Sequence, residues 1–189
     1  MREKWIVETK KGDFNGLSAK LKVSPLAVRC LMNRGVESEQ EMREFLYGTL
    51  DDLHDPLLMK GMDEAVQEIV QAKEQGRKVA IASDFDCDGI FSAYILWKGF
   101  QRIGLDSKIF TPDRVKEGYG LNRRIVDEAL ASGRDFLVTC DNGIAANEEV
   151  DYAKKLGMTV IVTDHHEVQE QMPNADVVLD PKQDDETYP

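Results

Sequence analysis

The amino-acid sequence predicts an α/β fold, with a mostly parallel sheet flanked by helices. Two observations carry this prediction. Short apolar runs typical of buried strands recur along the chain at residues 79–82, 136–139 and 160–163, and segments with helical apolar spacing lie between them. This alternation makes successive strands parallel, because each helix carries the chain back along the sheet.

A short helical preface is predicted ahead of the sheet. Ser24 and Pro25 have the pattern of an N-cap and a first helical residue, and Gly35 follows as a stop signal. Ser38 and Glu41 have the spacing of a capping box, which predicts a second helix. Residues 1–56 are therefore assigned to a helical preface and residues 57–189 to the α/β domain.

The α/β domain begins with a helix that starts at Met62 and stops at Gly76. The expected elements that follow are a strand at 79–82, a helix at 90–103, a strand at 108–110, a helix at 123–132, a strand at 136–139, a helix at 147–156, and strands at 160–163 and 177–179. No closing helix is signalled in residues 176–189, so the sequence is expected to be truncated within this domain.

The composition is that of a globular protein. Of the 189 residues, 42% are hydrophobic, which is enough for a sizeable core. No apolar run approaches the roughly 20 residues that span a bilayer, so a cytoplasmic location without membrane contact is expected. The net charge of −11 excludes a protein that holds nucleic acid by bulk electrostatics, because Lys and Arg supply phosphate contacts.

Three of the predicted strands run directly into acidic or histidine residues. These are Asp84, Asp86 and Asp88 after 79–82, Asp141 after 136–139, and Asp164, His165 and His166 after 160–163. The carboxyl ends of parallel strands share one edge of a sheet, where ligands bind. Oxygen and imidazole ligands suit manganese, magnesium or zinc, so a metal site is predicted there.

Simpler interpretations exist for each piece of this pattern. One aspartate after a strand is usually the N-cap of the next helix. The segment 84–89 also resembles the start of a calcium-binding loop, but its twelfth position is Ile95 where a glutamate is needed. A receiver-like magnesium site is a better rival, although it has no use for adjacent histidines. The three strand ends together favour the metal site.

A loop at residues 111–121 follows the strand at 108–110 and is expected at the same edge. Arg114 and Lys116 in this loop are suited to contact a phosphate. Gly118 and Gly120 allow the backbone to approach a ligand closely. The simpler interpretation is a glycine turn with solvated charges.

Three segments in this order resemble the motifs of the DHH superfamily of phosphoesterases: DFDCDG at 84–89, VTCDNGI at 138–144 and TDHH at 163–166. The segments PDRVKEGYGLN, LMNRG and FLYGTLDDLHDP resemble the RecJ branch of that superfamily. The resemblance covers nearly the whole chain. Some members carry a histidine where this chain has Ala82, and no segment after His166 matches the superfamily's later acidic motif.

The resemblance implies a site for two divalent ions, Mn²⁺ or Mg²⁺. Its implied metal ligands are Asp86, Asp88, Asp141 and His165, with Asp141 bridging the two ions. Its implied catalytic residues are Asp84, Asp141, His166 and Arg114. Its implied substrate-binding residues are Arg114, Gly118, Tyr119 and Gly120.

The implied function is two-metal hydrolysis of single-stranded DNA from its 5′ end, in DNA repair or recombination. The resemblance also implies a missing carboxyl-terminal domain as an intramolecular partner, so this chain alone is expected to have weak activity or none. Two alternatives remain open. One is a phosphodiesterase for short oligonucleotides or cyclic dinucleotides, and the other is a non-catalytic fragment that binds metal or a partner.

Overall fold

The computed structural model describes Ile6 and residues 10–188. The chain divides into an amino-terminal unit, Met1–His54, and a carboxyl-terminal unit, Asp55–Pro189. The sequence analysis divides the chain after residue 56, and we retain that division as a proposal about its domains.

The amino-terminal unit consists of short helices, which are α1 (Phe14–Leu21), α2 (Pro25–Asn33), α3 (Glu39–Tyr47) and the 3₁₀ helix η1 (Leu50–Asp52). The N-cap predicted for α2 and the capping box predicted for α3 are both present. Ser24 caps α2, and Ser38 and Glu41 form the capping box of α3. The sequence analysis did not predict α1, because its Asn15-Gly16 pair is typical of a turn, yet Asp13 caps this helix by accepting from the Gly16 N–H.

The helices of this unit enclose a small apolar core of their own. Its buried members are Leu21, Val28, Leu31, Met32 and Met42. They come from all three α-helices, so the helical preface has packing of its own in addition to its caps.

The carboxyl-terminal unit contains the alternating strands and helices. They are the 3₁₀ helix η2 (Pro56–Leu58), α4 (Met62–Glu74), β1 (Val79–Ser83), α5 (Cys87–Arg102), β2 (Ser107–Phe110), α6 (Arg123–Ala131), β3 (Phe136–Cys140), α7 (Asn147–Lys155), β4 (Thr159–Thr163) and β5 (Val177–Leu179). The strands form one sheet in the order β2-β1-β3-β4-β5, and every neighbouring pair is parallel. The predicted α/β class and parallel sheet are confirmed.

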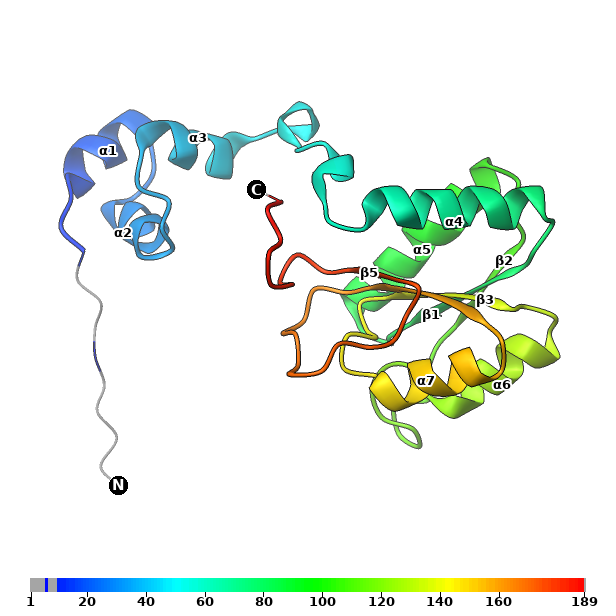
Figure 1. Ribbon diagram of the computed structural model, residues 1–189. Coiled ribbons are helices and arrows are strands. Elements are labelled where there is room, and N and C mark those ends of the chain that lie inside the picture. The colour runs from blue at the N-terminus through cyan, green and yellow to red at the C-terminus, as the bar shows by residue number, and fades with distance from the viewer. Residues whose placement is uncertain (1–5, 7–9, 189) are drawn as a thin grey trace, which may run out of the picture. The chain divides into compact units, whose positions relative to one another are not determined.

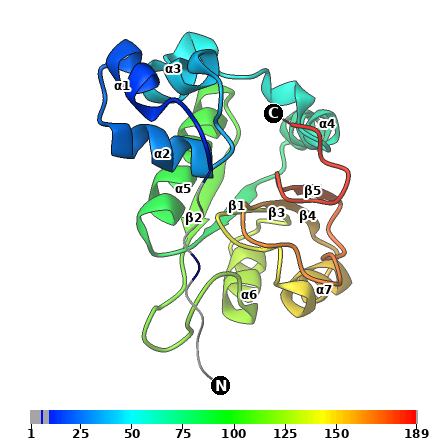
Figure 2. The ribbon, with the colours of Figure 1, turned by 90° about the vertical axis from the view of Figure 1, so that its left-hand side faces the viewer.

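Helices cover both faces of the sheet. Figure 1 shows α4 and α5 above the strands and α6 and α7 below them, and Figure 2 shows α6 and α7 side by side under the sheet. One core lies beneath α4 and α5 and includes Phe136 and Ile81. The second lies against α6 and α7 and includes Ile125 and Val160. Burial on both faces explains why these strands read as continuous apolar runs.

Helix α5 begins three residues earlier than the predicted start at residue 90. Asp86 is its N-cap and accepts a hydrogen bond from the Gly89 N–H. Gly89 is required by space, because a Cβ at this position would lie 2.7 Å from the main-chain oxygen of Asp84. The apolar periodicity does not extend into the segment Cys87-Asp88-Gly89, so it could not reveal this first turn.

None of the helices in the described part of the chain is both long enough and apolar enough to cross a membrane.

Phe136 is the largest fully buried side chain of the sheet core, and we expect Phe136→Ala to lower the free energy of unfolding by about 3–5 kcal/mol through lost burial and a cavity. The matched control is Phe91→Ala on α5, whose side chain is 66% exposed, with an expected change within about 0.5 kcal/mol. Urea denaturation followed by circular dichroism measures both. Equal losses for the two variants would contradict this assignment of the core.

Candidate metal centre

The pairing of β1, β3 and β4 brings three loops to one edge of the sheet. Ser83 at the end of β1 pairs with Cys140 at the end of β3, so Asp84 and Asp141 follow neighbouring strands at the same level. The Asp141 N–H donates to the main-chain oxygen of Thr163, the last residue of β4. The chain order reverses between β1 and β3, and in open parallel sheets ligands bind at such a switch point.

Two groups of possible metal ligands form at this edge, and they share Asp141. One group is Asp86, Asp88 and Asp141, and the other is Asp141, His165 and His166. Within each group the ligand atoms lie within 4.8 Å of one another. The structure therefore brings together all four residues that the resemblance implies as metal ligands, with Asp141 common to both groups.

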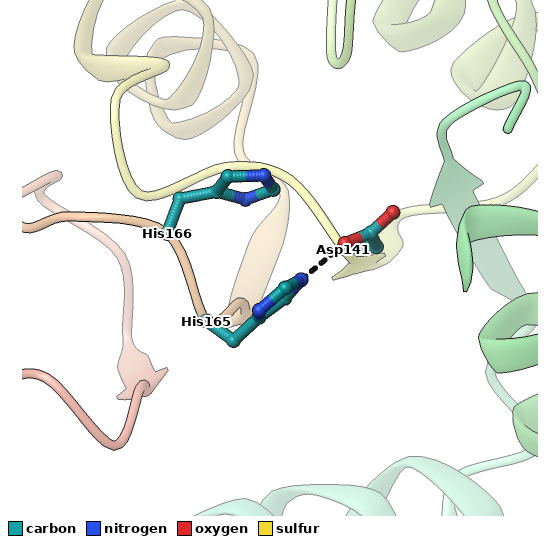
Figure 3. A group of neighbouring side chains, drawn as sticks. All are labelled: Asp141, His165 and His166. Atoms are coloured by element: carbon teal, nitrogen blue, oxygen red, sulfur yellow. Dashed lines mark hydrogen bonds and ion pairs between the residues drawn. The ribbon is translucent and has the colours of Figure 1, made fainter. Parts of the chain in front are cut away.

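His165 is directed at the Asp141 carboxylate, as Figure 3 shows. Its Nε2 atom lies 2.7 Å from Asp141 Oδ1 and 3.8 Å from Asp88 Oδ2. The hydrogen bond to Asp141 requires a proton on Nε2, whereas a metal requires the lone pair of a neutral imidazole. A cation bound here would take the place of that proton between the imidazole and the carboxylate.

His166 faces different partners. Its Nδ1 atom lies 2.7 Å from Asp164 Oδ1, and its Nε2 atom lies 3.2 Å from the Tyr119 hydroxyl. That hydroxyl donates its only proton to the main-chain oxygen of Asp141 at 2.8 Å, so the contact with Nε2 is a hydrogen bond only when Nε2 is protonated. The Asp164 carboxylate accordingly raises the pKa of His166.

Asp141 is held in an unusual position. Its backbone is left-handed, with φ of +61°, which is uncommon for a residue other than glycine. Its side chain is almost fully buried, and Oδ2 has no hydrogen-bond partner among the described residues. Burial raises the pKa of this carboxyl, and the charges of Asp88 and Asp86 add to the effect.

The donor set fits a divalent cation. Three carboxylates held this close repel one another, and one has a buried oxygen without a partner, which is costly unless a positive charge compensates it. Carboxylate and imidazole ligands suit manganese, magnesium or zinc better than a metal that prefers thiolates.

The carboxylate of Asp86 also has a structural role. Because it accepts from the Gly89 N–H at the start of α5, the pKa of Asp86 is lowered. Asp86 and Asp88 are both exposed. The start of α5 thus places two accessible carboxylates beside the buried one of Asp141.

Asp84 lies outside both ligand groups. Its side chain is fully buried, and Oδ1 accepts from the Gly120 N–H at 3.4 Å, while Oδ2 has no partner among the described residues. Gly120 has a φ of +73°. Asp84, which was predicted as a catalytic residue, therefore contacts the loop at 111–121 through Gly120.

The other residues of this loop that were predicted to bind substrate have different surroundings. The Arg114 guanidinium lies over the Phe85 ring at 5.1 Å from its centroid, so it contacts the first motif but neither ligand group. Gly118 is exposed, with φ of +81° and open space around it. Of the predicted substrate-binding residues, Tyr119 contacts the Asp141 and His166 pair directly.

Arg124 holds this loop in place. It is paired with Glu117, and its Nη2 donates to Glu117 Oε2 at 2.7 Å. The guanidinium is the main reason why the pKa of Glu117 is lowered to about 2. Glu117 also accepts from the Asp113 N–H, so one carboxylate fixes both ends of the turn that carries Arg114.

Three buried polar residues for which the sequence predicted no specific role follow β3, β4 and β5. Asp164 accepts from the N–H groups of Ile144 and His165 as well as from His166. Asn142 is 1% exposed and donates to the main-chain oxygens of Ala82 and Cys140. Asp180 follows β5 and is fully buried, which raises its pKa. Their position after strands was the available signal, but it did not distinguish ligands from supports.

The DHH family, N-terminal domain, matches residues 78–187 of this chain. This match lies inside the carboxyl-terminal unit and contains every residue of both ligand groups.

Curated relatives resemble the chain over most of its length. The single-stranded-DNA-specific exonuclease RecJ of Bacillus subtilis is 36% identical over 187 residues, which are 98% of this chain and 24% of that protein. RecJ of Escherichia coli is 34% identical over 166 residues, which are 87% of this chain and 28% of that protein. The chain thus spans about a quarter of the length of these relatives.

Solved structures resemble it as well. A crystal structure of exonuclease RecJ bound to manganese has 35% identity and a TM-score of 0.61, over 65% of this chain and 31% of that one. RecJ of Thermus thermophilus in complex with Mn²⁺ has 28% identity and a TM-score of 0.63, over 89% of this chain and 23% of that one.

The contact between Asp164 and His166 predicts a pH effect in the metal-free protein. Asp164 stabilises protonated His166, so this contribution to stability is complete below the unfolded-state pKa and is lost as the pH rises through the higher folded-state pKa. Asp164→Asn should lower the pKa of His166, as measured by an NMR titration. Asp127→Asn, which changes a carboxylate that contacts Tyr152, should leave it unchanged. The same His166 pKa in wild type and in Asp164→Asn would contradict the prediction.

Proposed function

The chain belongs to the DHH family, and we propose that it supplies the metal-binding part of a RecJ-like exonuclease that hydrolyses phosphodiester bonds in single-stranded DNA. The observation that carries this proposal is the pair of ligand groups that share Asp141. Two adjacent groups with a common carboxylate have the arrangement that a two-metal phosphoesterase needs.

We propose that Asp86, Asp88, Asp141 and His165 hold two divalent ions, with Asp141 between them. Manganese is the ion named for the two similar solved structures, and magnesium suits the carboxylates equally. When bound by these residues, such ions would supply a water of lowered pKa and positive charge for the phosphate oxygens. The buried, unpartnered Oδ2 of Asp141 supports its role as the carboxylate with two positions to offer.

Three further residues are proposed to act on the phosphate or on the ligands. His166, held between Asp164 and Tyr119, lies next to the proposed ligand His165, which suits a contact with a phosphate oxygen. Arg114 offers a positive charge from the loop beside the first motif. Asp84 positions this loop through Gly120.

The substrate proposal rests on the relatives. The proteins named above are specific for single-stranded DNA, and the degradation from the 5′ end, the role in repair or recombination and the cytoplasmic location remain predictions from the resemblance. With a net charge of −11, the chain has no general excess of cations to hold a strand, so local contacts near the metal centre must position the scissile phosphate. We further propose residues 1–56 as the preface and 57–189 as the DHH domain.

Asp141→Asn should weaken Mn²⁺ binding at least about tenfold, because loss of a direct ligand costs no less than loss of a supporting contact. The amide keeps the size of the side chain and one acceptor oxygen but removes the charge common to both ligand groups. Titration calorimetry measures the affinity, and Asp127→Asn is the control with the same change of charge. Unchanged Mn²⁺ affinity in Asp141→Asn would remove this residue from the site.

A chimera with a full-length relative tests the proposed function without requiring residues beyond those of this chain. The 187 residues of the B. subtilis relative that match this chain are replaced by this chain, and the product is incubated with Mn²⁺ and 5′-labelled single-stranded DNA, duplex DNA or a dinucleotide. We expect mononucleotides from the single strand, and none from the chimera with Asp141→Asn. The isolated chain should turn over much more slowly.

Two outcomes would contradict the proposed function. One is a folded chimera that binds Mn²⁺ but releases nothing from single-stranded DNA. The other is a preference for the dinucleotide, which would favour a phosphodiesterase of short oligonucleotides.

A further inference from the structure

A cleft of about 380 Å³ borders the candidate metal centre on the side of His166. Asp164 and His166 line one part of it, and Tyr119, Asn122 and Ala145 line others. The His166 ring lies between this cleft and His165, with the two imidazole centroids 4.6 Å apart. A group in the cleft would therefore lie next to a phosphate bound at the metal ligands.

The charge of the cleft is unsuited to an anion. Among its lining residues are the carboxylates of Glu117, Glu149 and Asp164, and the described part of the chain contributes neither a lysine nor an arginine to the lining. Glu117 is already paired with Arg124 and Asp164 with His166, which leaves Glu149 as an additional negative charge. A phosphate would meet no compensating cation there, apart from His166 at the border.

The other lining residues suit an uncharged ring with polar edges. The wall between residues 142 and 146 combines peptide groups with the small side chains of Ala145 and Ala146. Tyr119 also lines the cleft and is 53% exposed, and its hydroxyl is bound to the Asp141 carbonyl. Small-molecule sites of this size typically combine apolar surface with a few fixed polar groups.

We propose that this cleft binds the nucleoside attached to the phosphate that the metal centre holds. This inference rests on the proposed function, since it assigns the neighbouring site to a nucleotide chain. The phosphate is bound by the metal ligands, while the uncharged base and sugar occupy the cleft beside Tyr119 and Ala145. The acidic lining keeps the phosphate out of the cleft and thereby fixes which part of the nucleotide enters.

The test fills the cleft from a residue that belongs to neither ligand group. Ala145 is exposed and lies in the loop before α7, so Ala145→Leu and Ala145→Phe put increasing volume into the cleft without altering a ligand. The probes are labelled dTMP and labelled inorganic phosphate, measured by equilibrium dialysis with the Mn²⁺-loaded protein. Ala131→Phe, at the exposed end of α6, is the matched control.

We expect dTMP affinity to fall with the volume added, by at least about tenfold for Ala145→Phe, as for a pocket that must reject an oversized group. Affinities for phosphate and for Mn²⁺ should stay as in wild type, and Ala131→Phe should change none of them. Unchanged dTMP binding in Ala145→Phe would overturn the proposal. A parallel loss of phosphate binding would overturn it too, because the cleft would then hold the phosphate.

This test is separate from that of the proposed function. Loss of dTMP binding in Ala145→Phe supports the cleft as a nucleoside site even if the chimera releases no mononucleotides. Conversely, the chimera could be active while Ala145→Phe binds dTMP as wild type does. This result would support the exonuclease assignment but contradict the assignment of the cleft to a nucleoside.

Discussion

The parallel pairing of β1, β3 and β4 is the constraint on which the site depends. Ser83 pairs with Cys140, and the Asp141 N–H donates to the oxygen of Thr163, so the loops after all three strands begin at nearly the same level. Burial of the sheet on both faces by helices makes a slip in this register expensive, since every strand residue would change its face. Residues distant in sequence are thereby held within reach of one cation.

The assembled charges oppose folding in the absence of metal. Asp86, Asp88 and Asp141 lie within ligand distance of one another, and Asp141 combines a buried oxygen with a left-handed backbone. Such local costs persist only where the surrounding structure fixes the geometry. Here the fixing contacts are those of β3 and β4 and the Tyr119 hydroxyl on the Asp141 carbonyl. A divalent ion bound to these carboxylates would stabilise the folded chain.

The loop at 111–121 connects the candidate metal ligands to the surface around them. Asp84 binds its backbone at Gly120, Asn142 Oδ1 accepts from the Leu121 N–H, and Tyr119 contacts both Asp141 and His166. This loop is therefore a structural support of the ligands on one side and a wall of the adjacent cleft on the other. A shift of this loop would be transmitted to His166 through the Tyr119 hydroxyl.

The sequence by itself determined the α/β class, most of the strands and helices, and the loops that carry the ligands, because buried strands and capped helices leave local periodic patterns. It missed α1, whose Asn15-Gly16 pair resembles a turn, and it placed the start of α5 too late, because the helix begins at an N-cap inside the ligand motif. Only the tertiary structure decided which strand-end residues meet. Asp84 accepts from the Gly120 N–H, Asp164 is hydrogen-bonded to His166, and residues of three loops line one cleft. These contacts could not be predicted, because side-chain direction and long-range contacts follow from packing rather than from local sequence.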